Sequence, residues 1–230
     1  MQTSDSSFRS NDIRAVILDL DGTMIDSVAD IHLALNRMKA DFSLPEIDIE
    51  QVRRYVGRGS ENLVRSTLSD DVEPEGVQRM LARAMSSFYR HYRETNGRYG
   101  AVYPGVFEGL NTMHEAGLRL ACVTNKPSVF TEPLLAMTGL YHYFDRIYSA
   151  DSLPKRKPDP FPMQMACEFF SIRTSQALVI GDSVNDAQSA RSAGCLLFIV
   201  PYGYNHGQRV EDIDADAIVA DFEEAARLIL

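Results

Sequence analysis

The segment that most constrains this chain is Asp19-Leu20-Asp21-Gly22-Thr23, which directly follows the apolar run Ala15-Val16-Ile17-Leu18. The run has no polar alternation, so it predicts a strand that is buried on both faces of a sheet. Two carboxylates therefore lie where a strand ends, and Gly22 lets the backbone turn away sharply at that point. Two acids so placed repel each other unless a cation or a proton lies between them.

Such a pair of carboxylates suits phosphoryl transfer. One carboxylate can attack phosphorus and form an acyl phosphate. The other can protonate the leaving oxygen and then deprotonate the attacking water, while a divalent cation neutralises the phosphate and the nucleophile. A strand-end turn rich in Asp and Gly has the same pattern, so this motif alone leaves a purely structural interpretation open.

Composition limits the classes of partner and compartment. The 230 residues, 45% of them hydrophobic and 24% charged, suit one large globular domain or a domain with an insertion. A net charge of −9 argues against nucleic acid, and no apolar stretch is long enough for a membrane. Cys122, Cys167 and Cys195 form no close pair, which favours buried free thiols in a reducing cytoplasm. The polar residues 1–11 are expected to be a disordered lead-in.

The pattern of secondary structure changes along the chain. Residues 27–99 have helical spacing and few strand signals, whereas from residue 100 onward short apolar strands alternate with helices. That alternation predicts right-handed βαβ units and a parallel sheet, to which the strand before Asp19 belongs. We therefore expect an α/β fold with a Rossmann-like parallel-sheet core domain of residues 12–26 and 100–230. An inserted small α-helical domain comprises residues 27–99.

Four polar clusters each follow a predicted strand of the α/β part or begin the next helix. They are Asp19 with Asp21, Thr124 with Asn125, Lys157 before Pro158, and Asp182 with Asp186. In an open parallel sheet, ligands bind outside the carboxyl ends of the strands, so the four clusters are expected to converge on one crevice.

Each cluster has a chemical interpretation beside a structural one. Thr124 and Asn125 at a helix N-terminus suit a phosphate oxygen, and the ammonium of Lys157 can offset charge there. Asp182 directly after a buried strand is costly without a cation, and Mg²⁺ prefers such oxygen ligands. Asp186 can add a water-mediated contact to that cation or orient Lys157. Helix capping and a solvated basic turn are the structural alternatives.

Taken in order, the clusters resemble the four-motif pattern of the haloacid dehalogenase (HAD) superfamily, whose phosphatases carry Asp-x-Asp-Gly-Thr after the first strand. The resemblance covers roughly Arg14 to the C-terminus, and it implies that the helical insertion is a cap. The residue roles that it implies are a nucleophile at Asp19, a general acid and base at Asp21, phosphate binding by Thr124 and Lys157, and Mg²⁺ binding by Asp19, Asp182 and the backbone carbonyl of Asp21.

Within the superfamily, several segments are similar to the phosphoglycolate phosphatase subgroup. They are Val56-Gly57-Arg58-Gly59, Val123-Thr124-Asn125-Lys126-Pro127, Lys157-Pro158-Asp159-Pro160, Gly181-Asp182-Ser183-Val184-Asn185-Asp186 and Tyr202-Gly203-Tyr204-Asn205-His206-Gly207. This likeness implies Mg²⁺-dependent hydrolysis of 2-phosphoglycolate to glycolate and phosphate through an aspartyl-phosphate. The chain has Arg58 where members of the subgroup often carry Asn.

Arg58 is a candidate for substrate specificity. Glycines on both sides let the backbone bring its side chain close to the core, and the guanidinium matches a carboxylate. We expect Arg58 to bind the carboxylate of phosphoglycolate, assisted by Ser60 or the next helix N-terminus. An exposed arginine on a loop is the alternative, since surface arginines are common.

Other functions fit parts of the same pattern. A phosphosugar phosphatase or a phosphoglucomutase-like enzyme uses the same scaffold, but a mutase needs cap residues that shuttle a bisphosphate, and none is identifiable. Hydrolytic dehalogenases of the superfamily lack the second acid that Asp21 supplies. A receiver-type signalling module also has a phosphorylatable Asp, Mg²⁺ and a Lys, but it is about half this length and carries that Asp on a later strand. We expect a small phosphate ester as the partner, and a monomer or homodimer.

Overall fold

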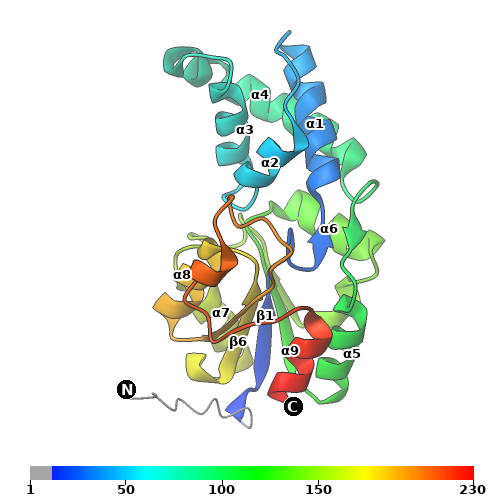
Figure 1. The fold of residues 1–230 in the computed structure, drawn as a ribbon, viewed down its shortest axis with the longest axis vertical. Coiled ribbons are helices and arrows are strands. Elements are labelled where there is room, and N and C mark those ends of the chain that lie inside the picture. Colours follow the sequence, from blue (N-terminus) through cyan, green and yellow to red (C-terminus); the bar gives the residue numbers. More distant parts are fainter. Residues whose placement is uncertain (1–11) are drawn as a thin grey trace.

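The computed structural model describes residues 12–230, so the expected disordered segment 1–11 lies outside the described residues. Within them, a six-stranded sheet with helices on both faces forms one part of the molecule. Helices α1 to α4 form a second part, which stands over one end of the sheet (Figure 1). No helix of residues 12–230 is long and apolar enough to cross a membrane.

The sheet has the strand order β5-β4-β1-β6-β7-β8, and every neighbouring pair is parallel. Its strands are β1 (Ala15–Leu18), β4 (Arg119–Val123), β5 (Arg146–Tyr148), β6 (Ala177–Gly181), β7 (Leu196–Ile199) and β8 (Ala217–Ile218). Strand β1 lies in the interior of the sheet, and all its residues are buried. The α/β fold with a parallel sheet, expected from the sequence, is confirmed.

Both faces of the sheet are covered by helices. Val16 and Leu18 pack on one face, against α5 (Val106–Glu115) and α9 (Phe222–Ile229). Ile17 points to the other face, where α7 (Phe161–Phe170) and α8 (Val184–Ala193) pack. Alternate strand residues thus enter two different cores, and this explains why the run before Asp19 has no polar residue. Short 3₁₀ helices span Tyr141–Tyr143, Thr174–Gln176 and Val210–Asp212.

The helical part has a core of its own. Its helices are α1 (Val28–Asp41), α2 (Ile49–Tyr55), α3 (Ser60–Ser69) and α4 (Pro74–Thr95). Ile31, Leu35 and Met38 recur at helical spacing on the buried face of α1, where they pack with Val64 and Phe88. Each fully buried side chain of this kind contributes roughly 1.5–3 kcal/mol. This second core also contains Phe130 and Tyr204 of the α/β part, so it stabilises the helical part and packs it against the rest of the molecule.

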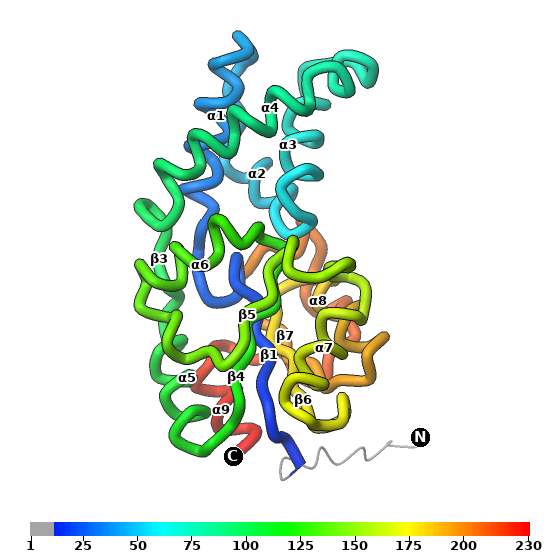
Figure 2. Tube along the Cα trace, turned by 180° about the vertical axis from the view of Figure 1, so that it is seen from behind, coloured from blue at the N-terminus to red at the C-terminus, as the bar shows by residue number. Residues whose placement is uncertain are grey.

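Two short segments join the parts. Strands β2 (Ile25–Asp26) and β3 (Ala101–Val102) pair antiparallel, so the outgoing and returning chains form a two-stranded ribbon. The buried carboxylate of Asp30 accepts hydrogen bonds from the backbone N–H groups of Gly97 and Tyr99, at 2.9 and 2.8 Å, which ties the end of α4 to α1. Helix α6 (Ser128–Met137) lies at the junction of the two parts in both views (Figure 1 and Figure 2).

Candidate active site

The carboxyl ends of the central strands meet under the helical part. Asp19 and Asp21 follow β1, Thr124 follows β4 and Asp182 follows β6, so the parallel order of the strands places these side chains at one edge of the sheet. Lys157 reaches the same place from the loop between β5 and α7, because its ammonium contacts Asp19.

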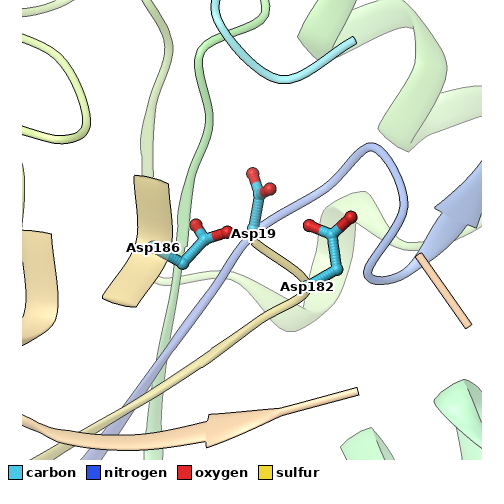
Figure 3. Close-up of side chains that lie close together, drawn as sticks. All are labelled: Asp19, Asp182 and Asp186. Carbon is cyan, nitrogen blue, oxygen red and sulfur yellow. The ribbon is translucent and has the colours of Figure 1, made fainter. Parts of the chain in front are cut away.

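Three carboxylates form an acidic cluster. The side chains of Asp19, Asp182 and Asp186 lie close together, and one carboxylate oxygen of each lies within 4.8 Å of the others (Figure 3). The Nζ atom of Lys157 lies 2.7 Å from Oδ1 of Asp19 and 2.7 Å from Oδ1 of Asp186. Oδ2 of Asp186 accepts a hydrogen bond of 2.7 Å from the Ser183 hydroxyl. Asp186 is therefore held by Ser183 while it contacts Lys157 directly.

Asp182 is the carboxylate whose charge is least compensated. It is 3% exposed, and it accepts hydrogen bonds from the backbone N–H of Tyr204 at 2.5 Å and from the Thr23 hydroxyl at 3.2 Å. Within residues 12–230 it has no ion pair of its own. Burial raises the pKa of Asp182 well above its usual range, and the neighbouring carboxylates of Asp186 and Asp19 raise it further. These three acids therefore fit a divalent cation, which prefers carboxylate oxygens and would relieve their repulsion.

The pKa values of Asp19 and Lys157 are shifted by the same surroundings. Burial raises the pKa of Asp19 to about 7; Lys157 opposes this shift and Asp186 adds to it. Burial alone would lower the pKa of Lys157, but the carboxylates of Asp186 and Asp19 outweigh it and raise that pKa. Lys157 therefore stays charged at neutral pH, and a cation in the cluster would favour the ionised form of Asp19 that a nucleophile requires.

Asp21 has different neighbours from Asp19. Its Oδ1 accepts a hydrogen bond of 2.6 Å from the Ser27 hydroxyl and lies 2.9 Å from Nζ of Lys126. Its carboxylate is not among the three that cluster. The expectation that the backbone carbonyl of Asp21 binds a metal ion stays a prediction. The two acids of the first motif thus occupy distinct environments, as is typical of carboxylates with different roles in catalysis.

The sequence pattern suggested no role for Lys126 or Tyr92. The Lys126 side chain is 3% exposed, and its ammonium donates to the hydroxyl of Tyr92 and lies 4.7 Å from the centre of that ring. Tyr92 lies on α4, so this contact joins the helical part to the site. Lys126 precedes Pro127 just as Lys157 precedes Pro158, a signal that could have identified it. Tyr92 has no such signal in the sequence.

A small cavity of about 40 Å³ lies between the two parts, with room for a few water molecules. The residues that line it from the α/β part are Asp19, Asp21, Thr124, Asn125, Lys126 and Pro127, and those from the helical part are Ile31, Val56, Gly57, Gly59, Ser60, Leu63, Phe88 and Tyr92. Polar groups thus line one side of the cavity and mostly apolar side chains line the other.

The structure does not bring Arg58 into this cavity. Gly57, with a φ of 106°, and Gly59, with a φ of 87°, line it, whereas Arg58 between them is not among the lining residues. Arg58 instead lines a separate cavity with Arg156 and Lys157. The hypothesis that Arg58 binds a substrate carboxylate is therefore not supported by this arrangement, whereas Ser60 does line the active-site cavity.

Thr124 and Asn125 differ in what they offer a phosphate. The Asn125 amide donates to the carbonyls of Gly57 and Lys157, both at 2.9 Å, so its N–H groups are used on the protein. Asn125 therefore links the α2–α3 loop to the segment that carries Lys157, rather than presenting donors to a phosphate. The Thr124 hydroxyl accepts from the backbone N–H of Lys126 at 3.1 Å, and its own proton can be donated to a ligand.

The chain has a parallel α/β sheet with two acids directly after its first strand. A buried lysine and a further acid follow later strands. Together these features define a class of hydrolase. Residues 16–200 match the family model of the haloacid dehalogenase-like hydrolases, and the chain belongs to this family. The resemblance to the HAD superfamily is confirmed.

Known relatives cover nearly the whole chain. It is 48% identical to a phosphoglycolate phosphatase of Nitrosospira multiformis over 94% of this chain and 96% of that protein. It is 44% identical to a phosphoglycolate phosphatase of Thiobacillus denitrificans over the same shares. A crystal structure of a predicted phosphoglycolate phosphatase from Haemophilus somnus 129PT superposes with a TM-score of 0.88 at 30% identity, over 95% of this chain and 99% of that one.

Proposed function

We propose that this chain is a phosphatase that hydrolyses 2-phosphoglycolate to glycolate and phosphate through a phosphorylated Asp19. The observation that carries the proposal is the separation of two acids in one cavity: Asp19 lies beside Lys157 and the acidic cluster, and Asp21 lies apart from it. The choice of substrate is supported by the phosphoglycolate phosphatases to which the chain is 48% and 44% identical.

The reaction has two steps. In the first, a carboxylate oxygen of Asp19 attacks phosphorus, the bond from phosphorus to the ester oxygen breaks, and Asp21 gives its proton to the departing glycolate oxygen. In the second, Asp21 takes a proton from a water molecule that attacks the same phosphorus, and the bond from phosphorus to Asp19 breaks. Lys157 and Thr124 hold the phosphate oxygens, and Lys157 offsets negative charge in both steps.

Asp19, Asp182 and Asp186 are the residues that would hold Mg²⁺. When bound, Mg²⁺ offsets the negative charge of the phosphate and of the Asp19 carboxylate. The support is the chemistry of the donors, since three neighbouring carboxylates, two of them buried, have a single ammonium beside them, which pairs with Asp19 and Asp186.

We further propose that residues 27–99 act as a cap over a core domain of residues 12–26 and 100–230. The ribbon of β2 and β3 would let the cap open for the substrate and close to exclude water during the transfer. The position of the cavity supports this role, because both parts line it and their separation would widen the way in for a ligand.

The compartment and assembly are also proposals. Cys122, Cys167 and Cys195 are all buried free thiols, which fits a reducing cytoplasm. We propose a monomer or homodimer, which analytical ultracentrifugation would distinguish.

A turnover screen tests the proposed function. Phosphate release would be measured from 2-phosphoglycolate, sugar phosphates and ethyl phosphate, with Mg²⁺ and with a chelator. The proposal requires Mg²⁺-dependent turnover with the highest kcat/KM for 2-phosphoglycolate, and acid quenching should trap phosphate on Asp19. A higher kcat/KM for a sugar phosphate, isomerisation of a sugar phosphate, or a long-lived phosphoprotein without turnover would each point to one of the alternative functions.

A further inference from the structure

Lys126 is a buried cation that has no role in the two chemical steps described above. Its side chain is 3% exposed, and it is the one positively charged side chain among the described residues that line the active-site cavity. The ammonium has three N–H donors and makes three hydrogen bonds within residues 12–230: to Oδ1 of Asp21 at 2.9 Å, to Oδ2 of Asp21 at 3.3 Å and to the hydroxyl of Tyr92. An acceptor on a ligand can take the place of the longest of these bonds, the one to Oδ2 of Asp21.

We propose that Lys126 is the specificity-determining residue of this enzyme and binds the carboxylate of the substrate, an inference that rests on the proposed function. Asp21 must contact the ester oxygen in order to protonate it, and Nζ of Lys126 lies 2.9 Å from Oδ1 of Asp21. In 2-phosphoglycolate the carboxylate carbon is two bonds from the ester oxygen. A substrate whose ester oxygen contacts Asp21 therefore has its carboxylate within reach of Lys126.

Among the described residues, the rest of the cavity lining offers a carboxylate no other cation. Lys157 is already shared between Asp19 and Asp186, and Arg58 lines a different cavity. The helical part contributes mainly apolar side chains such as Leu63 and Phe88. An unpaired carboxylate would be costly in such surroundings, so an acidic substrate gains most by contacting Lys126.

Tyr92 makes this recognition depend on the closed position of the helical part. Its hydroxyl accepts from the Lys126 ammonium, and its ring stacks on Phe88 with centroids 5.2 Å apart. Opening of the helical part would withdraw this partner from Lys126. The ammonium is therefore fully positioned only when the site is closed.

The test compares 2-phosphoglycolate with ethyl phosphate, which has a methyl group in place of the carboxylate. In Lys126→Met, the ratio of kcat/KM for 2-phosphoglycolate to that for ethyl phosphate should fall roughly 10- to 100-fold, the worth of one charged hydrogen bond. Lys126→Arg should retain a preference for 2-phosphoglycolate, because it retains the charge. If Lys126→Met does not fold, the Lys126→Arg variant still tests the proposal.

Two further variants serve as controls. Ser27→Ala removes the other donor to Asp21 but leaves the cation, so it should slow both substrates by the same factor. Lys155→Met removes a lysine whose side chain is 61% exposed and should change neither rate. An equal loss on both substrates in Lys126→Met, or no loss on either, would overturn the proposal; the first result would make Lys126 a positioning residue for Asp21.

A binding measurement separates this proposal from the proposed function. Calorimetric affinities of Asp19→Asn for both ligands do not require turnover, and the same pair measured in Asp19→Asn/Lys126→Met isolates the lysine. The preference for 2-phosphoglycolate should be present in the first protein and absent in the second. Lack of turnover in the wild-type enzyme would count against the proposed function alone, whereas equal preferences in the two binding experiments would count against Lys126.

Discussion

The Nζ atom of Lys157 lies 2.7 Å from Oδ1 of Asp19, and the two side chains are 2% and 12% exposed. The ammonium lies equally far from Asp186, so it is held between the expected nucleophile and a carboxylate that Ser183 fixes in place. Lys157 therefore neutralises part of the acidic cluster, while Asp182 has no ion pair within residues 12–230.

Replacing Asp19 or Asp21 by asparagine should reduce catalytic activity to different extents. Asp19→Asn should abolish phosphate release, because an amide cannot supply the attacking oxygen. Asp21→Asn should lower kcat by ~10²–10⁴-fold, as is typical for loss of a general acid and base. Steady-state kinetics on 2-phosphoglycolate would measure both changes. Near-native activity in Asp19→Asn would exclude the covalent mechanism.

Asp182 should control metal binding. Asp182→Asn removes a carboxylate from the cluster, so calorimetry should show a large loss of Mg²⁺ affinity together with loss of activity. Circular dichroism should show that the fold is retained, because Asn can still accept from the backbone N–H of Tyr204. Unchanged Mg²⁺ affinity would remove Asp182 from the metal site.

The pH dependence of stability follows from the raised pKa values in the cluster. Burial raises the pKa of Asp19 from its ordinary value of 3.8 to about 7, so between these values the folded chain binds a proton that the unfolded chain has lost. The contribution of this group to the free energy of unfolding therefore falls as pH rises through that window. The pKa of Asp182 is raised as well, so it acts in the same direction.

The Asp182→Asn variant isolates this effect of pH on stability. In a chelator, Asp182→Asn should be more stable than the wild type, and the difference in Tm should be larger at pH 8 than at pH 5. Mg²⁺ should raise the Tm of the wild type at pH 8 and have little effect on the variant. A difference in Tm that shrinks as pH rises would contradict the assigned direction of the pKa shifts.

Gly203 keeps Asp182 in place by having no side chain. A Cβ atom at this position would lie 2.3 Å from Oδ2 of Asp182 and 2.5 Å from the carbonyl oxygen of Gly22. Gly203→Ala should therefore displace the carboxylate and weaken Mg²⁺ binding at least tenfold, an effect of about 1.4 kcal/mol. Gly139→Ala is the matched control, because its Cβ would meet nothing within 4 Å although its φ is +75°. It should reduce stability without changing Mg²⁺ affinity; equal affinities in the two variants would rule out this role for Gly203.

Much of the site was predictable because its chemistry is local in the sequence. Asp19, Thr124 and Asp182 each follow a buried strand directly, and the parallel order of the strands brings their ends together. A short apolar run and the polar residue after it are both visible in sequence. The buried strand and its acidic end could therefore be recognised together.

The contacts between the two parts could not be predicted in this way. Lys126 and Tyr92 belong to different parts of the fold, and their contact depends on how α4 lies over the sheet. The direction of Arg58 depends on the flanking loop, whose Gly57 carbonyl is held by Asn125 from the other part. The ribbon of β2 and β3 has two residues in each strand, too few for a periodic pattern.

His206 joins the two parts at the edge of the site. Its Nδ1–H donates to the carbonyl of Arg54 on α2 at 3.2 Å, and its Nε2 accepts from the amide of Asn185 at 3.0 Å. Burial lowers the pKa of His206 below its ordinary value of 6.5; the hydrogen bond to Arg54 opposes this shift, and the charge of Arg58 adds to it. The neutral ring is therefore the form that holds the parts together.

The closed arrangement should consequently weaken in acid. A ring with a lowered pKa stabilises the closed form above about pH 6.5 and progressively less as pH falls, because a protonated Nε2 can no longer accept from Asn185. His206→Ala should remove this pH dependence and should lower the free energy that favours the closed form at neutral pH by about 0.5–1.5 kcal/mol. Hydrogen exchange of the α2–α3 loop would measure the stability of the closed form. After correction for the intrinsic rate, exchange in the wild type should be faster at pH 5.5 than at pH 7.5. In His206→Ala it should already be fast at pH 7.5. His142→Ala, at an exposed position in the α/β part, is the control and should behave like the wild type. If the loop of His206→Ala were as protected as that of the wild type at pH 7.5, His206 would have no part in holding the site closed.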